Sequence, residues 1–413
     1  MIVPEEQRRF ALAVATRLRE AGFEAYWAGG CVRDEILGRQ PKDFDVATNA
    51  TPHEIRELFG RRRTLALGAA FGVITVRGPR AAGMIEVATF RQDSLTSDGR
   101  RPDHVTFSSA REDAARRDFT INGLFFDPVK RRVIDFVGGQ EDLARRVVRA
   151  IGEPRQRFAE DKLRLLRAVR FTASLDFTLE SETAAALREM AAQISVVSPE
   201  RIAMEMRRLL TEPGRARGAR LLLNVGLAAA LLPEIVPGEP AGQERLDRAL
   251  AALGRLREPT FPLALATLLQ GVVTPAGVRA IGLRWRLSNR EVDRAAWLVE
   301  HCEALAGARQ ARWSRLQPLL IAPGIADLLA LNEASGPELA GEAAYCRQLL
   351  DRPREVLDPP PLLTGDDLAA HGIPPGPVYR TLLERLRAAQ LDGEVRTIAE
   401  ALALAERLWR EAG

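Results

Sequence analysis

The sequence predicts an α+β protein in which a mixed N-terminal domain precedes an all-helical remainder. Strand and helix signals alternate over the first ~140 residues. From about Glu160 onward, Ala, Leu and Arg recur at helical spacing, and Pro/Gly clusters interrupt the pattern. A chain of 413 residues with 46% hydrophobic side chains is long enough for two or more domains with a sizeable core.

Local signals place the elements in order. Helices are predicted at residues 5–20, Val32–Leu37 and residues 51–59, the last beginning with the cap and N1 pair Thr51-Pro52. Strands are predicted at Ala25–Ala28, Asp43–Ala47, Gly72–Arg77 and Met84–Phe90. In the helical remainder, breaks are predicted at Glu212–Gly214, Pro237–Gly242 and Pro359–Leu362, with Pro353–Pro361 as the best linker candidate.

Composition excludes several classes of protein. The longest apolar runs, such as Ala228–Leu232, fall far short of the roughly 20 residues that a membrane span needs. Residues Met1–Arg9 carry no apolar signal-peptide core. Cys31, Cys302 and Cys346 are too few and too scattered for a disulfide framework or a zinc cluster. These features predict a cytoplasmic protein with reduced thiols and no membrane partner.

The charge balance is nearly even. Lys and Arg number 59 against 55 Asp and Glu, and the net charge of +4 does not by itself indicate nucleic acid. Only Lys42, Lys130 and Lys162 are lysines, and the remaining 56 cations are arginines. Arginine suits forked recognition of phosphates and bases, although a GC-rich coding sequence explains the same bias.

Asp43-Phe44-Asp45 is the first motif that carries chemistry. On a strand, residues two apart project from the same face, so the two carboxylates would lie together while Phe44 and Val46 face the core. Close-set carboxylates hold the metal ions that phosphoryl transfer requires. A solvated strand edge is the ordinary explanation of an isolated pair.

A segment that begins with two glycines, Gly29–Asp34, ends about ten residues before this acidic pair. Gly29 and Gly30 stand where a strand ends and a helix begins, which leaves backbone amides free to meet a triphosphate. Arg33 would add a charge-assisted contact from the first helical turn. A plain Gly-Gly turn with a surface arginine is the alternative, but the two motifs together favour a nucleotidyltransferase palm.

Glu86 offers a third acid. It interrupts the apolar strand Met84–Phe90, and a charge in such a place needs a partner. A role in metal binding or as a general base beside Asp43 and Asp45 would explain the charge. The alternative is an ordinary glutamate on a sheet face, which would give the same sequence pattern.

Two polar clusters follow. Residues 116–123 combine Arg116, Arg117, Asp118 and Asn122, which could fix ribose hydroxyls and phosphates or cap a surface helix. In residues 160–171, Asp161 and Arg164 stand one helical turn apart. A carboxylate beside a guanidinium can accept from the exocyclic amine and donate to the ring nitrogen that cytosine and adenine both present, whereas uracil and guanine present the opposite order of donor and acceptor. An intrahelical salt bridge is the alternative for this pair.

Together with their surrounding residues, these motifs resemble those of a known family, the class II tRNA nucleotidyltransferases and poly(A) polymerases. The resemblance covers roughly residues 28–171 and includes seven motifs in family order: GGCVRD, KDFDVATNATP, IEVATFR, DGRRPDHVTF, RRDFTINGL, DFVGGQEDL and RFAEDKLRLLRAVRF. It implies a polymerase-β-like head at residues 1–145, then a helical neck at 146–215, a body at 216–355 and a tail at 356–413 that binds tRNA.

The resemblance also implies residue roles. Asp43 and Asp45 match the Mg²⁺ ligands, Glu86 the third active-site carboxylate, and Gly30 and Arg33 the contacts to nucleotide phosphates. Arg117 and Asp118 match the ribose-binding motif. The nucleotide-selecting helix would use Asp161 and Arg164, completed by Arg167 and Arg170. The segment between Phe90 and Phe107 matches a loop that helps to switch from C to A addition.

Some positions depart from the family pattern. Residues 93–98 lack a Gly and a Tyr that are common there, and Asn122-Gly123 resembles the form found in poly(A)-adding or A-adding relatives. The four histidines form no His-Asp pair, so no phosphohydrolase activity is expected.

The expected function is addition of C and A nucleotides to the 3′ end of tRNA, using CTP, ATP and Mg²⁺. Enzymes that add only CC, only A, or poly(A) remain alternatives, as does a catalytically silent RNA-binding protein. No DNA partner is expected.

Overall fold

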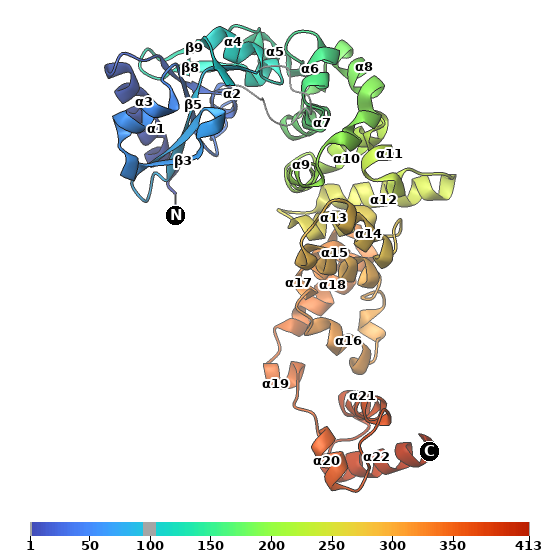
Figure 1. Cartoon of the computed structure of the whole chain (residues 1–413). Helices are drawn as coiled ribbons and strands as arrows, with labels where there is room; N and C mark the ends of the chain where they lie inside the picture. The colour runs from blue at the N-terminus through green and yellow to red at the C-terminus, as the bar shows by residue number, and fades with distance from the viewer. Residues whose placement is uncertain (1, 94–104, 413) are drawn as a thin grey trace. The chain divides into compact units, whose positions relative to one another are not determined.

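The computed structural model describes residues 2–93 and 105–412. The chain divides into two compact units, Met1–Pro233 and Glu234–Gly413. Strands and helices alternate in the first part of unit 1, and every later segment is dominated by helices (Figure 1). This arrangement confirms the predicted α+β class.

A seven-stranded mixed sheet forms the N-terminal half of unit 1. Its strand order is β3-β4-β5-β2-β1-β8-β9, and the strands are β1 (Ala25–Ala28), β2 (Asp45–Thr48), β3 (Thr64–Gly68), β4 (Val73–Arg77), β5 (Met84–Thr89), β8 (Phe125–Asp127) and β9 (Arg132–Ile134). Only β2 and β5 run parallel, and the other neighbours are antiparallel. The helices of this half are α1 (Pro4–Glu20), α2 (Gly30–Ile36), α3 (Pro52–Phe59), α4 (Ala110–Ala115) and α5 (Gly139–Arg145).

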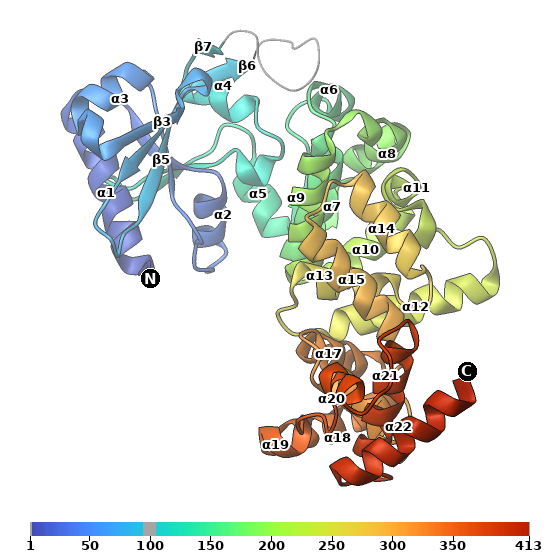
Figure 2. The same ribbon diagram turned by 60° about the horizontal axis from the view of Figure 1, so that its bottom comes forward.

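The two faces of the sheet differ. Val46 and Val87 are fully buried on the face that α1 and α3 cover (Figure 2). Because successive strand residues point to opposite faces, their neighbours Asp45 and Glu86 project from the other face, where both are exposed. The alternation thus leaves Asp45 and Glu86 accessible on this face, while further along the same strand as Asp45, Ala47 is buried in a cluster with two alanines of α4.

The second half of unit 1 is a helical bundle. Its helices are α6 (Pro154–Glu160), α7 (Leu163–Leu175), α8 (Ser181–Met190), α9 (Pro199–Thr211), α10 (Arg215–Asn224) and α11 (Leu227–Leu231), with a short parallel pair of strands, β10 (Val147–Val148) and β11 (Thr178–Leu179). Helix α7 packs against both α9 and α10. Ten of its thirteen residues are buried, so α7 is the central element of the bundle.

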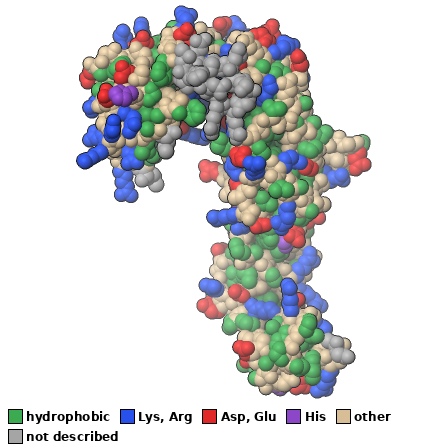
Figure 3. Space-filling view, in the orientation of Figure 1, with side chains coloured by type: hydrophobic (Ala, Val, Ile, Leu, Met, Phe, Trp, Pro, Cys, Tyr) green, Lys and Arg blue, Asp and Glu red, His purple; other side chains and the backbone are tan. Residues whose placement is uncertain are grey.

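Unit 2 is entirely helical in the part of the chain that the structure describes. It contains α12 (Pro240–Arg255), α13 (Phe261–Leu269), α14 (Pro275–Arg284), α15 (Asn289–His301), α16 (Trp313–Leu320), α17 (Ile325–Ser335), α18 (Pro337–Leu350), α19 (Arg354–Leu357), α20 (Gly365–Ala370), α21 (Val378–Leu391) and α22 (Ile398–Ala412). The last three helices share an apolar cluster that includes Leu368, Leu382 and Leu408. On the face drawn in Figure 3, cationic and anionic side chains are interspersed along this unit.

The predicted elements of the N-terminal part are confirmed with small shifts at their ends. Helix α2 begins two residues earlier than predicted, and the predicted linker Pro353–Pro361 contains the short helix α19. Strands β3, β8 and β9 of the sheet were not predicted. Of the predicted loop between Phe90 and Phe107, the ends pair as β6 (Arg91–Asp93) and β7 (Val105–Phe107), and residues 94–104 lie outside the described part.

The predicted four-part division stays a prediction. The compact units place one boundary at Pro233, close to the predicted break at Pro237–Gly242, and unit 1 contains both the predicted head and the predicted neck.

Candidate active site

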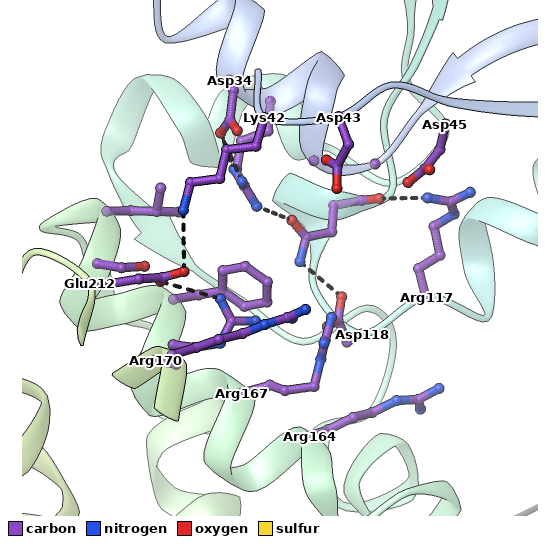
Figure 4. Close-up of a pocket in the computed structure, with 18 of the residues that line it drawn as sticks. Asp34, Lys42, Asp43, Asp45, Arg117, Asp118, Arg164, Arg167, Arg170 and Glu212 are labelled. Carbon is purple, nitrogen blue, oxygen red and sulfur yellow. Dashed lines mark hydrogen bonds and ion pairs between the residues drawn. The ribbon is translucent and has the colours of Figure 1, made fainter. Parts of the chain in front are cut away.

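Three acids meet where the parallel strands β2 and β5 begin. Asp45 lies directly opposite Glu86 in the register of the two strands, and Asp43 lies beside Asp45 (Figure 4). The Asp45 side chain keeps an exposed edge, yet desolvation by the surrounding protein, followed by the negative charges of Asp43 and Glu86, raises its pKa to about 7. A site that gathers negative charge in this way favours a bound cation.

One part of the sequence argument was wrong. Asp43 was predicted on the strand, but β2 begins at Asp45. The neighbouring strand β1 ends at Ala28, and Gly29 then turns the chain with a φ of 73°. Residues before Asp45 therefore have no ladder partner on that side. Phe44 and Val46 are buried as predicted.

The glycine turn opens helix α2 toward the same site. Gly29 is the N-cap of α2, and no side chain caps the helix. The φ of 73° at Gly29 is one that residues with a side chain rarely adopt, and a Cβ there would lie 2.9 Å from Arg117 Nη1. Glycine therefore suits this turn. Arg33, one turn into the helix, donates to Asn122 Oδ1 at 2.7 Å. This contact links the turn to the Arg117–Asn122 segment.

Asp118 is buried and held by several donors. Its Oδ1 accepts from the Phe119 amide at 2.8 Å and from Asn122 Nδ2 at 3.0 Å, and its Oδ2 lies 2.7 Å from Arg167 Nη2. Burial alone would raise its pKa, but the Arg167 charge and these hydrogen bonds outweigh burial and lower it to about 2. Asp118 is therefore a permanent anion that ties the head segment to α7.

Helix α7 supplies the opposite wall. Figure 4 shows Arg164, Arg167 and Arg170 across the pocket from Asp43 and Asp45. The Phe171 ring lies 5.3, 5.2 and 4.1 Å from the guanidinium carbons of Arg33, Arg167 and Arg170, which favours cation–π contacts. Arg170 is almost buried and donates to Glu205 Oε2 of α9 at 2.6 Å.

The side chains of Asp161 and Arg164 pair with other residues rather than with each other. The helix that was expected to carry both is broken, because α6 ends at Glu160 and α7 begins at Leu163. Asp161 pairs with Arg201 of α9 at 2.7 Å, and Arg164 pairs with Glu160 at 2.6 Å. The alternative explanation, an intrahelical salt bridge between Asp161 and Arg164, is thus wrong.

A single pocket of about 840 Å³ collects these groups within unit 1. Twelve of the thirteen predicted site residues line it: Gly29, Gly30, Arg33, Asp43, Asp45, Arg117, Asp118, Asn122, Asp161, Arg164, Arg167 and Arg170. Glu86 lies outside the lining. Arg116, from the predicted polar cluster at residues 116–123, lines the pocket as well. The pocket lining further includes residues that the sequence analysis did not assign to the nucleotide site: Lys42, Phe171, Arg201, Arg208 and Glu212.

The donor set fits a divalent ion that takes only part of its shell from protein. In the described part of the chain, no three His, Cys, Asp or Glu side chains form a complete metal cage. Mg²⁺ commonly binds through one or two carboxylates plus water and substrate phosphates. Asp43 and Asp45 at the edge of a pocket with arginines opposite meet that requirement.

Nucleotidyl transfer requires carboxylates for a metal ion and cations for a triphosphate within reach of one nucleotide. Fold and site therefore define the class of nucleotidyltransferases.

Comparison with known proteins narrows this class. Residues 25–149 match the family described as "Poly A polymerase head domain", and residues 176–238 match "Probable RNA and SrmB- binding site of polymerase A". CCA-adding enzymes of Lactobacillus gasseri and Geobacillus stearothermophilus are each 35% identical to the chain over 397 and 399 residues, 93% of each protein. The chain belongs to the family of CCA-adding enzymes.

Solved structures agree. The Bacillus stearothermophilus CCA-adding enzyme in complex with CTP superposes with a TM-score of 0.78 at 30% identity, covering 100% of this chain and 99% of that one. A Thermotoga maritima CCA-adding enzyme complexed with tRNA shares the fold, with a TM-score of 0.67 at 20% identity and coverage of 97% and 95%. These relatives confirm the predicted family and fold. Family membership also implies use of a divalent metal ion.

Two further expectations concern the whole chain. Cys31, Cys302 and Cys346 are all unpaired, as predicted. Among the described residues, every helix is too short or too polar to cross a bilayer.

Proposed function

We propose that this chain adds C, C and A to the 3′ end of tRNA, using CTP and ATP and releasing pyrophosphate. The carrying observation is that twelve predicted site residues from segments up to 141 positions apart line one pocket. Support comes from relatives named CCA-adding enzymes that match along 93% of the chain.

In this proposal Asp43 and Asp45 hold Mg²⁺, with Glu86 adjacent. A bound ion would favour deprotonation of the RNA 3′ hydroxyl and stabilise the leaving pyrophosphate. Gly29, Gly30 and Arg33 bind the triphosphate at the start of α2. Arg117, Asp118 and Asn122 position the ribose, and α7 supplies Arg167 and Arg170.

Base selection would use Asp161 and Arg164. A carboxylate accepts from the exocyclic amine of C or A, and a guanidinium donates to the ring nitrogen, whereas U and G present the reverse order of groups. Both side chains line the pocket, Asp161 from just before α7 and Arg164 from its first turn. We expect the reaction to take place in the cytoplasm, where tRNA and nucleotides meet and free thiols stay reduced.

The test is extension at single-nucleotide resolution of three RNAs: a tRNA lacking CCA, a tRNA ending in CC, and an unstructured RNA. CTP and ATP are supplied separately and together. Addition of C, C and A that then stops is the expected result. Addition of A only to the CC end would indicate an A-adding enzyme, addition of CC only a CC-adding enzyme, and long A tails a poly(A) polymerase. Absence of incorporation in the presence of Mg²⁺ would indicate a protein that binds RNA without catalysis.

A further inference from the structure

Asp161 is held by a residue forty positions away. Its Oδ1 accepts from the Leu163 backbone amide at 3.0 Å, and its Oδ2 accepts from Arg201 Nη2 at 2.7 Å. The backbone at Asp161 is extended, with φ −149° and ψ 106°. Asp161 lies between α6 and α7, where its carbonyl accepts from the Arg164 amide at 3.0 Å at the start of α7. Its side chain is fixed by one donor from this same turn, the Leu163 amide, and by one donor from another helix, Arg201.

Arg201 is well placed for this task. It lies in the first turns of α9, whose Ile202, Ala203 and Met206 are buried and anchor the helix. Arg201 and Asp161 are 30% and 25% exposed and both line the pocket. The pair is therefore shielded from much of the solvent while remaining open to a nucleotide.

The contact leaves acceptor capacity for a base. An ionised carboxylate has about four lone-pair sites on its two oxygens, and the Leu163 amide and Arg201 occupy one on each. A charge-assisted contact also restrains the carboxylate more strongly than a neutral hydrogen bond. Arg164 is restrained separately, by Glu160 and by the Arg116 carbonyl at 3.0 Å.

We propose that Arg201 is a positioning residue that fixes the Asp161 carboxylate and thereby sets the preference of the site for C and A over U and G. This inference rests on the proposed function, because it assumes that Asp161 reads the base. It assigns to α9 a part in nucleotide selection, through a carboxylate that α9 itself does not carry.

The experiment compares CTP with UTP in full-length Arg201→Met and Arg201→Lys. The kcat/KM for each nucleotide is measured on a tRNA lacking CCA, and equilibrium binding of CTP and UTP is measured without RNA. Arg201→Met should lower the CTP/UTP ratio about 10-fold, and Arg201→Lys, which keeps the charge, should restore part of it. Lys also serves if the Met variant does not fold, as judged by its melting temperature.

Arg208→Met is the matched control. Arg208 lies two turns further along α9 and lines the same pocket, but its contact is with Glu205 at 3.8 Å. Its replacement should leave the CTP/UTP ratio unchanged, whatever it does to the overall rate. Equal losses for CTP and UTP in Arg201→Met would overturn the proposal.

A double-mutant cycle separates positioning from direct contact. If Arg201 acts through Asp161, adding Arg201→Met to Asp161→Ala should not change the ratio further. An additional loss would mean that Arg201 touches the nucleotide itself, which contradicts a positioning role. Wild-type protein that binds CTP selectively but transfers nothing would refute the proposed function while leaving the selection test intact.

Discussion

At the residue scale, the site combines carboxylates under opposite influences. Asp45 is surrounded by Asp43 and Glu86, and its pKa is raised to about 7. Asp118, more deeply buried, faces Arg167 and two neutral donors, and its pKa is lowered to about 2. The difference follows from neighbours rather than burial, because burial raises the pKa of both. Asp45 is thus suited to a metal ion that binds together with the substrate, whereas the charge of Asp118 is already balanced by the Arg167 guanidinium.

Asp45→Asn should reduce nucleotide transfer by at least ~100-fold, the scale of losing a preorganised charge. Stability should not fall with it. A carboxyl whose folded pKa is raised destabilises the fold when ionised, so the amide removes a repulsion at pH 8. The measurements are incorporation of labelled CMP and the melting temperature.

Glu86→Gln is the comparison variant, because Glu86 is the register partner of Asp45 but lies outside the pocket lining. Its effect on transfer should be smaller. An Asp45→Asn protein that keeps most of its activity would contradict the assigned metal site.

Asp118→Asn should lose stability in a pH-dependent way. The lowered pKa means that the ionised form stabilises the fold by about 2 kcal/mol above pH 4, and roughly half of this is lost by pH 3. The variant should therefore be less stable than wild type at pH 6, and the difference should narrow as the pH falls from 4 toward 2. Urea denaturation from pH 6 to pH 3 measures it, and a constant difference would contradict the ion pair with Arg167.

At the element scale, helices α7, α9 and α10 support the arginine wall. Glu205 of α9 is buried and contacts both Arg167 and Arg170 of α7. A buried carboxylate with two guanidiniums holds the two helices in one register, since removal of any member leaves an uncompensated charge. The direction in which the arginines project thus depends on packing between helices.

The chain just before α10 also packs closely against α7. Gly214 has a φ of 77°, and a Cβ there would lie 2.1 Å from the Ala173 carbonyl oxygen of α7. Gly214→Ala should lower the free energy of unfolding by more than ~2 kcal/mol, because it adds a backbone clash to the cost of a left-handed residue. Urea denaturation of the full chain provides the measurement.

Gly226→Ala isolates the backbone cost. Gly226 caps α11 with a φ of 81°, and its Cβ would meet only Ala191 Cβ at 3.7 Å. This variant should lose about 1 kcal/mol. Equal losses for the two variants would show that α7 and α10 are less closely packed than the structure has them.

At the scale of the whole molecule, all thirteen candidate site residues belong to unit 1. Unit 2 contributes none of them, and it contains the predicted tail at residues 356–413, to which the resemblance assigns tRNA binding. Nucleotide binding and tRNA binding are therefore expected to be separable along the chain.

A fragment of residues 1–233 should bind CTP with an affinity within a few-fold of the full chain, because it contains the complete pocket. Extension of tRNA by the fragment should be much weaker than by the full chain. Equilibrium CTP binding and an extension assay measure the two effects. Loss of CTP binding by a folded fragment would mean that unit 2 contributes to the nucleotide site.

The sequence by itself determined the features that depend on neighbouring residues. The start of α3 at the Thr51 cap and Pro52, the glycine turn before α2, and the burial of Phe44 and Val46 are all local. Hydrogen bonds and side-chain directions within a few residues are fixed by backbone geometry. The family motifs also identified twelve of the residues that line the pocket. The roles of the individual side chains stay predictions.

Only the tertiary structure decided which side chains meet. The spacing of Asp161 and Arg164 predicted neighbours on one helix, yet Asp161 pairs with Arg201 from α9. Arg170 likewise reaches Glu205, thirty-five residues away. Partners at such separations depend on how helices pack, and packing depends on the shape of the whole buried core. For that reason nothing in the sequence distinguishes Arg201 and Glu205 from other charged residues on a helix, and their roles depend on the packing of α7 against α9.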